Sequence, residues 1–205
     1  MPGLAGRARP AMEIRPLARE DRSLLDALAT ASVRAAALSS PAWLPTEAAA
    51  RAELAEALGP GRTALAALDG GVPAGWGAAF PSHESAWEIH PLLVDPARHG
   101  RGAGRALVAA LEAVAARAGA LAIELSTSDA TGATTLAGRD LWADPLGALA
   151  GLQVRAPGGR HAVAFWRALG YAVVGVLPDA EGRGVPSIRF AKRIAPRPVG
   201  GGEPG

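Results

Sequence analysis

Apolar and polar residues follow two different periods along the chain, and together these periods predict a domain of mixed α and β structure. Helical spacing of apolar residues predicts helices at 19–38, 47–58, 103–118 and 160–169, and a short helix around 140–150. Short apolar runs bounded by turn residues predict strands at 12–17, 62–69, 72–80, 86–94, 120–127, 171–177 and 187–193. Strands that alternate with helices indicate a sheet with helices packed on its faces.

Turn and capping residues support several of these boundaries. The Gly-Gly pair at 70–71 joins two predicted strands as a hairpin, and Thr46 is a suitable cap for the helix that follows it. Both ends of the chain, residues 1–11 and 195–205, are rich in Gly and Pro and show no periodicity. We therefore expect a single domain at 12–194 between two disordered tails.

Composition excludes several classes of protein. Hydrophobic residues make up 49% of the 205 positions, which excludes a wholly disordered chain. The chain has no Cys, which excludes disulfides, thiolate zinc sites and a Cys nucleophile, and the four His lack a metal-ligand spacing. No run approaches the roughly 20 apolar residues of a membrane-spanning helix. The first residues lack the apolar core of a signal peptide. We therefore expect a cytoplasmic protein that does not associate with a membrane. From the Cys and His pattern, we also expect no bound metal.

The charge pattern does not favour a nucleic-acid partner. The chain carries 21 Lys and Arg against 19 Asp and Glu, a net charge of +2. Lys192 is the only lysine, and the arginines are scattered rather than gathered into a basic run with interleaved aromatic residues. We therefore expect no nucleic-acid binding.

The clearest chemical signal is a glycine-rich segment, RHGRGAGRALVAALE (98–112), which follows a predicted strand and opens a predicted helix. Gly100, Gly102 and Gly104 let the backbone approach a ligand closely and direct successive N–H groups to one place. The helix start adds a partial positive charge, which suits a pyrophosphate. The segment lacks the Gly-Lys-Ser/Thr ending of a Walker loop and the acidic residue of a dinucleotide fingerprint. Three arginines can add side-chain charge: Arg98, Arg101 and Arg105.

The strand before this segment, WEIHPLLV (87–94), carries two ionisable residues. Glu88 and His90 are two positions apart in a strand, so their side chains share one face. Pro91 cannot donate to a strand ladder, and it therefore indicates a bulge or an opened edge. Two ionisable groups beside a phosphate cradle point towards a ligand, but the residues alone favour the alternative of a solvated edge-strand face.

The string from His99 to Gly104 resembles the acetyl-CoA-binding motif of the GCN5-related N-acetyltransferase superfamily, Gln/Arg-x-x-Gly-x-Gly/Ala, with His99 departing from the first position. FWRALGY (165–171) is similar to the superfamily's Phe-Tyr-x-x-x-Gly-Tyr/Phe element. More narrowly, the segments 87–94, 126–142 and 159–194 resemble aminoglycoside 6'-N-acetyltransferases. The resemblance covers most of residues 12–194.

This resemblance implies an α/β fold with a central, mostly antiparallel sheet. The sheet is splayed at the strand before the acetyl-CoA loop, and helices cover both faces. It also implies acetyl-CoA as co-substrate. For His161 and Phe165, helix packing is an equally good interpretation. The implied cofactor contacts are Leu93, Val94, His99, Gly100, Arg101, Gly102, Ala103, Gly104, Arg105, His161, Phe165 and Trp166.

Direct attack of an amine on the thioester needs a proton acceptor and a donor to the developing oxyanion. Glu88 is the candidate base and His90 the candidate assistant. The superfamily uses a backbone N–H that corresponds here to Leu92. Trp166 stands where related enzymes have a tyrosine that protonates the thiolate, and indole cannot do this. The only tyrosine, Tyr171, is the remaining candidate donor; a core aromatic with water as the proton source is the alternative.

The implied acceptor is a small polycationic amine, most specifically the 6'-amine of an aminoglycoside. Ser128 and Ser187 stand where the family has acidic residues, which keeps a polyamine, a small metabolite or a peptide N-terminus as alternative acceptors. Trp166 keeps a non-catalytic acyl-CoA-binding module open, and analogy allows a homodimer. The candidate acceptor contacts are Trp43, Glu88, Asp129, Asp140, Trp142 and Asp179.

Overall fold

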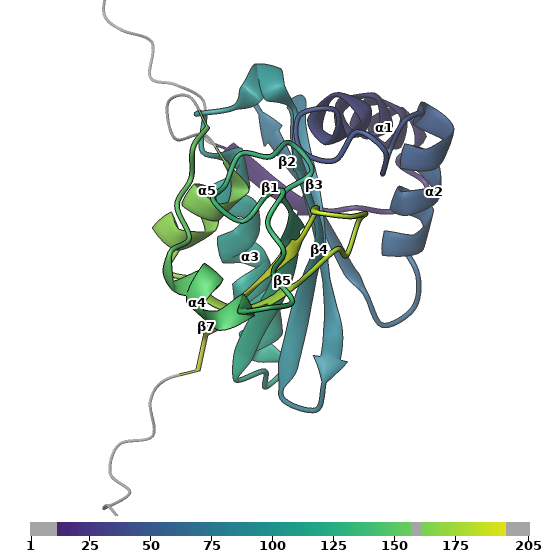
Figure 1. Ribbon diagram of the computed structural model, residues 1–205. Coiled ribbons are helices and arrows are strands. Elements are labelled where there is room, and N and C mark those ends of the chain that lie inside the picture. The colour runs from purple at the N-terminus through teal and green to yellow at the C-terminus, as the bar shows by residue number, and fades with distance from the viewer. Residues whose placement is uncertain (1–11, 157–160, 196–205) are drawn as a thin grey trace, which may run out of the picture.

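A computed structural model describes residues 12–156 and 161–195 of the chain. Its strands are β1 (Met12–Pro16), β2 (Thr63–Asp69), β3 (Val72–His83), β4 (Ala86–Val94), β5 (Ala122–Ser128), β6 (Ala172–Leu177) and β7 (Ser187–Arg193). Its helices are α1 (Arg22–Ala36), α2 (Glu47–Ala57), the 3₁₀ turn η1 (Pro96–Arg98), α3 (Ala103–Arg117), α4 (Pro145–Ala150) and α5 (Ala162–Ala168). All seven strands join one sheet in the order β1-β2-β3-β4-β5-β7-β6 (Figure 1).

The sheet is antiparallel except at its centre, where it opens. β4 and β5 are parallel and pair only from Ala86 to Glu88 on β4 and from Ala122 to Glu124 on β5. Beyond Glu88, β4 has no ladder partner on that side, whereas β5 continues to Ser128 and is paired with β7 along its whole length. This geometry confirms the predicted sheet, which is mostly antiparallel and splayed at the strand that precedes the glycine-rich loop.

Helices cover both faces of the sheet, as predicted, and each face has its own core. α1 and α2 pack on one face around Leu28, Leu54 and the fully buried Trp76, whose indole N–H donates to Ser32 at 2.8 Å. α3 and α5 pack on the other face, around a core that includes Leu111. Figure 1 shows the two helix pairs on opposite sides of the strands.

The predicted elements are all present, with small shifts at their ends. Strands 86–94 and 187–193 have the predicted bounds, and the side chain of Thr46 accepts a hydrogen bond from an amide of α2, as its capping role requires. Most of the two predicted tails lies outside the described residues. Ala195 is an exception, because its amide donates to the carbonyl of Leu121.

Candidate active site

The glycine-rich segment forms an amide cradle directly after β4. Gly100 and Gly102 have φ of 73° and 91°, the left-handed conformation that glycine adopts without strain, and they turn the chain into α3. The first hydrogen bond of the helix runs from the amide of Ala106 to the carbonyl of Gly102. The amides before Ala106 are therefore free to point at an anion, and the helix dipole favours negative charge there.

The cradle is packed against residues of β4 and α5. A Cβ built on Gly104 would lie 3.1 Å from the ring of Phe165 and 3.6 Å from the side chain of Val94, so Gly104 packs closely against Phe165. The cradle thus lies beside both the unpaired part of β4 and the start of α5. His99 is tied back to β4, because its Nε2 lies 3.0 Å from the carbonyl oxygen of Val94. The side chain of Leu93 is buried in the α1/α2 core, so only its backbone can contact the cofactor.

The three arginines of the cradle differ in their partners. Arg98 and Arg101 both reach the same carboxylate oxygen of Asp69, at 3.4 and 2.9 Å. Arg105 is exposed and forms no ion pair with the described residues. Of the three guanidinium groups, that of Arg105 is therefore the one left uncommitted for a ligand.

Asp95 couples the cradle to α1. Its side chain accepts from the amide of Ala97 at 3.1 Å, which caps η1, and forms an ion pair with Arg34. The hydrogen bond from Arg34 is the largest cause that holds the pKa of Asp95 below its ordinary value, against the opposing effect of burial.

The lowered pKa predicts an acid-sensitive contribution to stability. A carboxylate with a depressed folded-state pKa stabilises the fold above its unfolded value of about 3.9, and this contribution is lost as the pH falls through the folded-state pKa. We expect Asp95→Asn to lower the Tm relative to the wild type at pH 6, and we expect this difference to shrink below about pH 4. A difference in Tm that stays constant from pH 6 to pH 3 would contradict this assignment.

The acceptor side of the site lies on the opposite face of β4. Trp87 and Ile89 pack in the α3 core, so Glu88 and His90 face the α2 side, as the two-residue spacing predicted. The imidazole of His90 lies 5.4 Å from the ring of Trp43, measured between centroids. The carboxylate of Glu88 is half-buried and makes no hydrogen bond or ion pair within the described residues, so it is available to a substrate.

β4 carries the irregularity that Pro91 indicated. The register of β3 with β4 shifts between Gly77 and Ala79, and the His90–Pro91 peptide bond is cis. Leu92, the predicted oxyanion donor, lies just past the bulge opposite Gly77. Its role as donor stays a prediction.

The structure adds one acidic residue that sequence reasoning missed. The carboxylate of Glu53 on α2 lies 3.5 Å from Nε2 of His90, and its side chain is only 15% exposed. A signal was present in the sequence, because Glu53 falls in the same helical stripe as the buried Ala50, Leu54 and Ala57. A carboxylate on the apolar stripe of a helix is unusual enough to indicate a functional group.

Three of the predicted acceptor residues come together near the end of β6. The indole N–H of Trp142 donates to Asp179 at 2.9 Å, and the amide of Trp142 donates to Asp140 at 3.1 Å. Trp142 is 68% exposed. Asp179 also accepts from the amide of Gly184, and this hydrogen bond is the largest cause of its lowered pKa. The cluster presents an exposed aromatic ring beside two carboxylates.

Asp129 is a correction to the sequence-based prediction. It is 1% exposed and accepts hydrogen bonds from the amides of Ala133 and Thr134 and from the Thr134 hydroxyl. A carboxylate that is buried and saturated in this way cannot line an open cleft. Asp129 instead holds together the loop that follows β5.

His161 and Trp166 are also corrected, because both have structural roles in α5. The Nδ1 of His161 accepts from the amide of Val163, which caps the helix, and Nε2 lies 3.6 Å from Asp129. Burial lowers the pKa of His161, and the charge of Asp129 opposes that shift. Trp166 is buried in the α3 core with its ring edge against Phe165. Helix packing therefore describes both residues better than cofactor contact.

The hydroxyl of Tyr171, the candidate proton donor, is committed to a protein partner. It is 2% exposed, and its hydroxyl donates to the carboxylate of Glu112, which also pairs with Lys192. Burial, followed by the nearby charge of Glu112, raises the pKa of Tyr171 far above its ordinary value. Tyr171 is the core aromatic of the alternative interpretation.

Replacing Tyr171 by Phe separates the structural role from the catalytic one. We expect Tyr171→Phe to lower the free energy of unfolding by about 1 kcal/mol, because one partly buried hydrogen bond is lost while Glu112 keeps its lysine. The turnover number, measured by thiol release, should not change. A large loss of turnover in a folded variant would restore Tyr171 as a proton donor.

The fold and the cradle define the class of the protein, and comparisons with known proteins agree. The model of the Acetyltransferase (GNAT) family matches residues 28–139. A solved aminoglycoside 6'-N-acetyltransferase complexed with coenzyme A is 34% identical, with a TM-score of 0.79, and the match covers 91% of this chain and 99% of that chain. The aminoglycoside 6'-N-acetyltransferase from Enterococcus faecium is 34% identical over the same shares, with a TM-score of 0.77.

A third solved structure, aminoglycoside 6'-acetyltransferase type Ii, is 30% identical, with a TM-score of 0.66, and the match covers 91% of this chain and 99% of that chain. Comparison with curated protein sequences gives no match. A splayed sheet with an amide cradle at the end of β4 defines an acetyl-CoA-dependent N-acetyltransferase. The chain belongs to the GNAT family of acetyltransferases.

Two of the expected absences can be compared with the described residues. No group of three or more potential metal-ligating side chains lies together in this part of the chain. Within 12–156 and 161–195, no helix has both the length and the apolar character that a membrane crossing requires.

Proposed function

We propose that the protein transfers the acetyl group of acetyl-CoA to the 6'-amine of an aminoglycoside. The observation that carries the proposal is the group of His90, Glu53 and Trp43 on the α2 side of β4, the strand face that Glu88 shares with His90. Two carboxylates and an aromatic ring suit a sugar that carries ammonium groups. The similarity to three aminoglycoside 6'-N-acetyltransferases along 91% of the chain supports the same substrate class.

In this proposal, Glu88 takes the proton that the substrate ammonium must lose, directly or through a water molecule. The amine nitrogen then attacks the thioester carbonyl carbon, and the carbonyl oxygen becomes negative. The backbone N–H of Leu92 stabilises that oxygen. The nitrogen of the intermediate then loses its second proton to water. Collapse of the intermediate breaks the C–S bond and releases the thiolate of coenzyme A and the neutral amide. Glu53, next to His90, holds a second positive charge of the substrate.

The leaving thiolate takes its proton from water in this mechanism. Tyr171 is buried against Glu112, and the indole of Trp166 is no acid at neutral pH. A thiol has a pKa of about 8.5, so its thiolate is an adequate leaving group without a dedicated acid.

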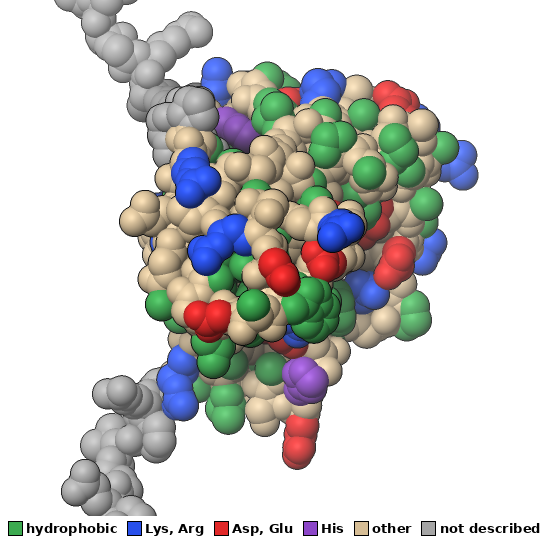
Figure 2. Space-filling model, viewed as in Figure 1, with side chains coloured by type: hydrophobic (Ala, Val, Ile, Leu, Met, Phe, Trp, Pro, Cys, Tyr) green, Lys and Arg blue, Asp and Glu red, His purple; other side chains and the backbone are tan. Residues whose placement is uncertain are grey.

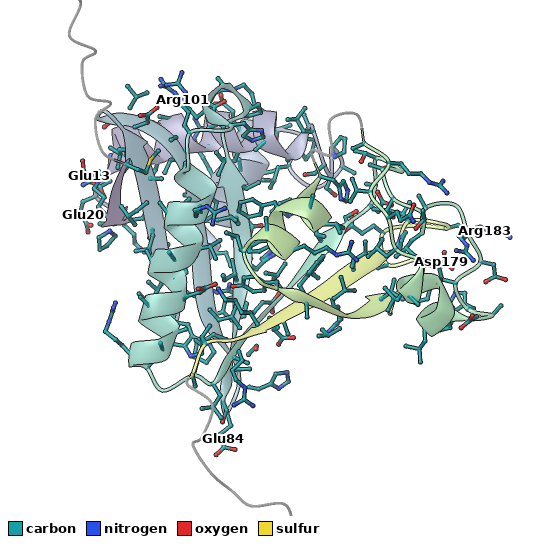
Figure 3. The ribbon with its side chains drawn as sticks, turned by 90° about the vertical axis from the view of Figure 1, so that its left-hand side faces the viewer. Glu13, Glu20, Glu84, Arg101, Asp179 and Arg183 are labelled. Carbon is teal, nitrogen blue, oxygen red and sulfur yellow. The ribbon has the colours of Figure 1, made fainter. Side chains whose placement is uncertain are left out.

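The second part of the acceptor site is the cluster of Trp142, Asp140 and Asp179. Figure 2 shows acidic side chains around hydrophobic side chains in the middle of one face, over the region where Figure 1 draws β4 and β5. Figure 3 labels Asp179 on the segment between β6 and β7. This segment is joined to the α1–α2 connection by a hydrogen bond of 2.9 Å from Ser40 to Glu181, so the two connections frame the site together.

The test is the release of free thiol from acetyl-CoA with a panel of amines. The panel holds kanamycin, tobramycin, an analogue with a 6'-hydroxyl group, spermidine and a short peptide. We expect release with the two 6'-amino compounds and none with the 6'-hydroxyl analogue. Release with spermidine or the peptide alone would contradict the aminoglycoside as acceptor and would support acetyl transfer to another amine. No release with any amine, together with a Tm raised by acetyl-CoA, would favour a binding module.

A further inference from the structure

The β2–β3 turn brings a buried carboxylate to the cradle from a distant part of the sequence. Asp69 is the last residue of β2, and its side chain is 5% exposed. Its Oδ2 accepts from Arg101 at 2.9 Å and from Arg98 at 3.4 Å, across about thirty residues of sequence. The two arginines lie on either side of Gly100 in the cradle segment.

The backbone around Asp69 is held firmly. In the sheet register, Asp69 is opposite Met12 of β1 and Val72 of β3, so strands on both sides fix its position. The two glycines that follow it, with φ of 64° and 82°, make the turn tight. The carboxylate is therefore presented from a rigid part of the sheet.

The segment that Asp69 contacts contains two residues with much more conformational freedom. Gly100 and Gly102 have positive φ, and a Cβ built on either would meet no atom within 4 Å. Both residues are exposed, and glycine has the largest conformational freedom of all residues. The amides of the cradle must nevertheless point to one place before a pyrophosphate binds.

We propose that Asp69 is a positioning residue for acetyl-CoA, because it clamps Arg98 and Arg101 and thereby fixes the two glycines between and beside them. In this arrangement, the guanidinium groups of Arg98 and Arg101 bind Asp69 and not the ligand. The pyrophosphate is bound by the backbone amides and by Arg105. The clamp of one carboxylate and two guanidiniums keeps one net positive charge, so it does not repel the anion.

The test is the affinity for coenzyme A, measured by calorimetric titration without any acceptor. We expect Asp69→Asn to weaken the binding of coenzyme A by about tenfold, because the loop would then have to become ordered on binding, and this ordering reduces the binding free energy. We expect kcat at saturating acetyl-CoA and the KM of the acceptor to stay within about twofold of the wild type. Asp26→Asn removes an equally charged partner of Arg51 on the distant surface of α1, and it should leave the affinity unchanged.

A double-mutant cycle distinguishes positioning from direct contact. The losses of coenzyme A affinity caused by Arg101→Gln and Asp69→Asn should not add, because each substitution breaks the same clamp. The losses caused by Arg105→Gln and Asp69→Asn should add. Additive losses for Asp69 with Arg101, or tighter binding of coenzyme A by Asp69→Asn, would overturn the proposal. A lower Tm with unchanged affinity would also overturn it, because Asp69 would then be structural only.

This inference rests on the acetyl-CoA dependence of the family and not on the proposed acceptor. Because the titration contains no amine, it can succeed when every aminoglycoside fails as an acceptor. It can equally fail when the aminoglycosides are acetylated.

Discussion

Replacing Glu88 by Gln should lower the kcat of amine acetylation by about 10²- to 10⁴-fold, the usual contribution of a general base. The carboxylate faces the α2 side of β4 without a protein partner, and glutamine keeps its size but cannot take a proton. The KM of acetyl-CoA should not change, because the cradle lies beyond the end of the strand. Initial rates of thiol release measure both parameters: kcat with both substrates saturating, and the KM of acetyl-CoA with a series of acetyl-CoA concentrations at saturating kanamycin.

Glu84→Gln is the matched control for this variant. Glu84 is exposed in the turn that joins β3 to β4, and Figure 3 shows it at the end of the molecule opposite Arg101. The control removes the same charge four residues away and should have the activity of the wild type. Equal kcat values for Glu88→Gln, Glu84→Gln and the wild type would remove Glu88 as the base.

Replacing Gly102 by Ala should weaken the binding of coenzyme A by about tenfold or more, since alanine at positive φ costs roughly 1–2 kcal/mol and the cradle must rearrange to avoid it. Gly102 is the N-cap of α3, with φ of 91°. The KM of acetyl-CoA should rise in parallel, while the KM of the amine stays the same. Calorimetric titration with coenzyme A measures the effect directly.

Gly119 offers an unusually close control, because it follows the other end of the same helix with φ of 89° and has equally open space around it. Gly119→Ala should cause a similar loss of thermal stability and no loss of affinity for coenzyme A. If both variants weaken binding equally, the effect comes from global destabilisation and not from the cradle.

The fold could be predicted almost completely because its signals are local. Each strand is a short apolar run that ends in a turn, and α3 starts where the glycine-rich segment stops. The pairing of β3 with β4 contains a bulge, which Pro91 predicted from the sequence. The boundaries that shifted include strand ends as well as helix ends: β3 continues to His83, and α4 starts only at Pro145. Element ends carry weaker sequence signals than element interiors.

The candidate site could be predicted only where a motif carried it. The amide cradle follows from glycine spacing, and the shared face of Glu88 and His90 follows from strand geometry. The family resemblance placed Asp129 and His161 in the site, and its residue type placed Tyr171 there, but all three have hydrogen-bonded structural roles. A chemically competent side chain gives no local signal of whether its partner is a substrate or the protein itself.

Glu53 and Asp69 show the limit of reasoning along the chain. Glu53 lies on a helix some forty residues before His90, and Asp69 precedes Arg101 by about thirty residues. Both carboxylates reach their partners only through tertiary contacts between separate elements. Neither has a motif, and the unusual position of Glu53 on an apolar stripe is the one local sign that either gives.

The position of the acetyl group in the product tests the central claim most directly. Kanamycin is converted with acetyl-CoA and the purified full-length protein, and the product is analysed by two-dimensional NMR and mass spectrometry. The account predicts a single acetyl group, on the 6'-nitrogen. Acetylation at another amine, or at several amines of the same molecule, would contradict the proposed acceptor geometry around Glu88.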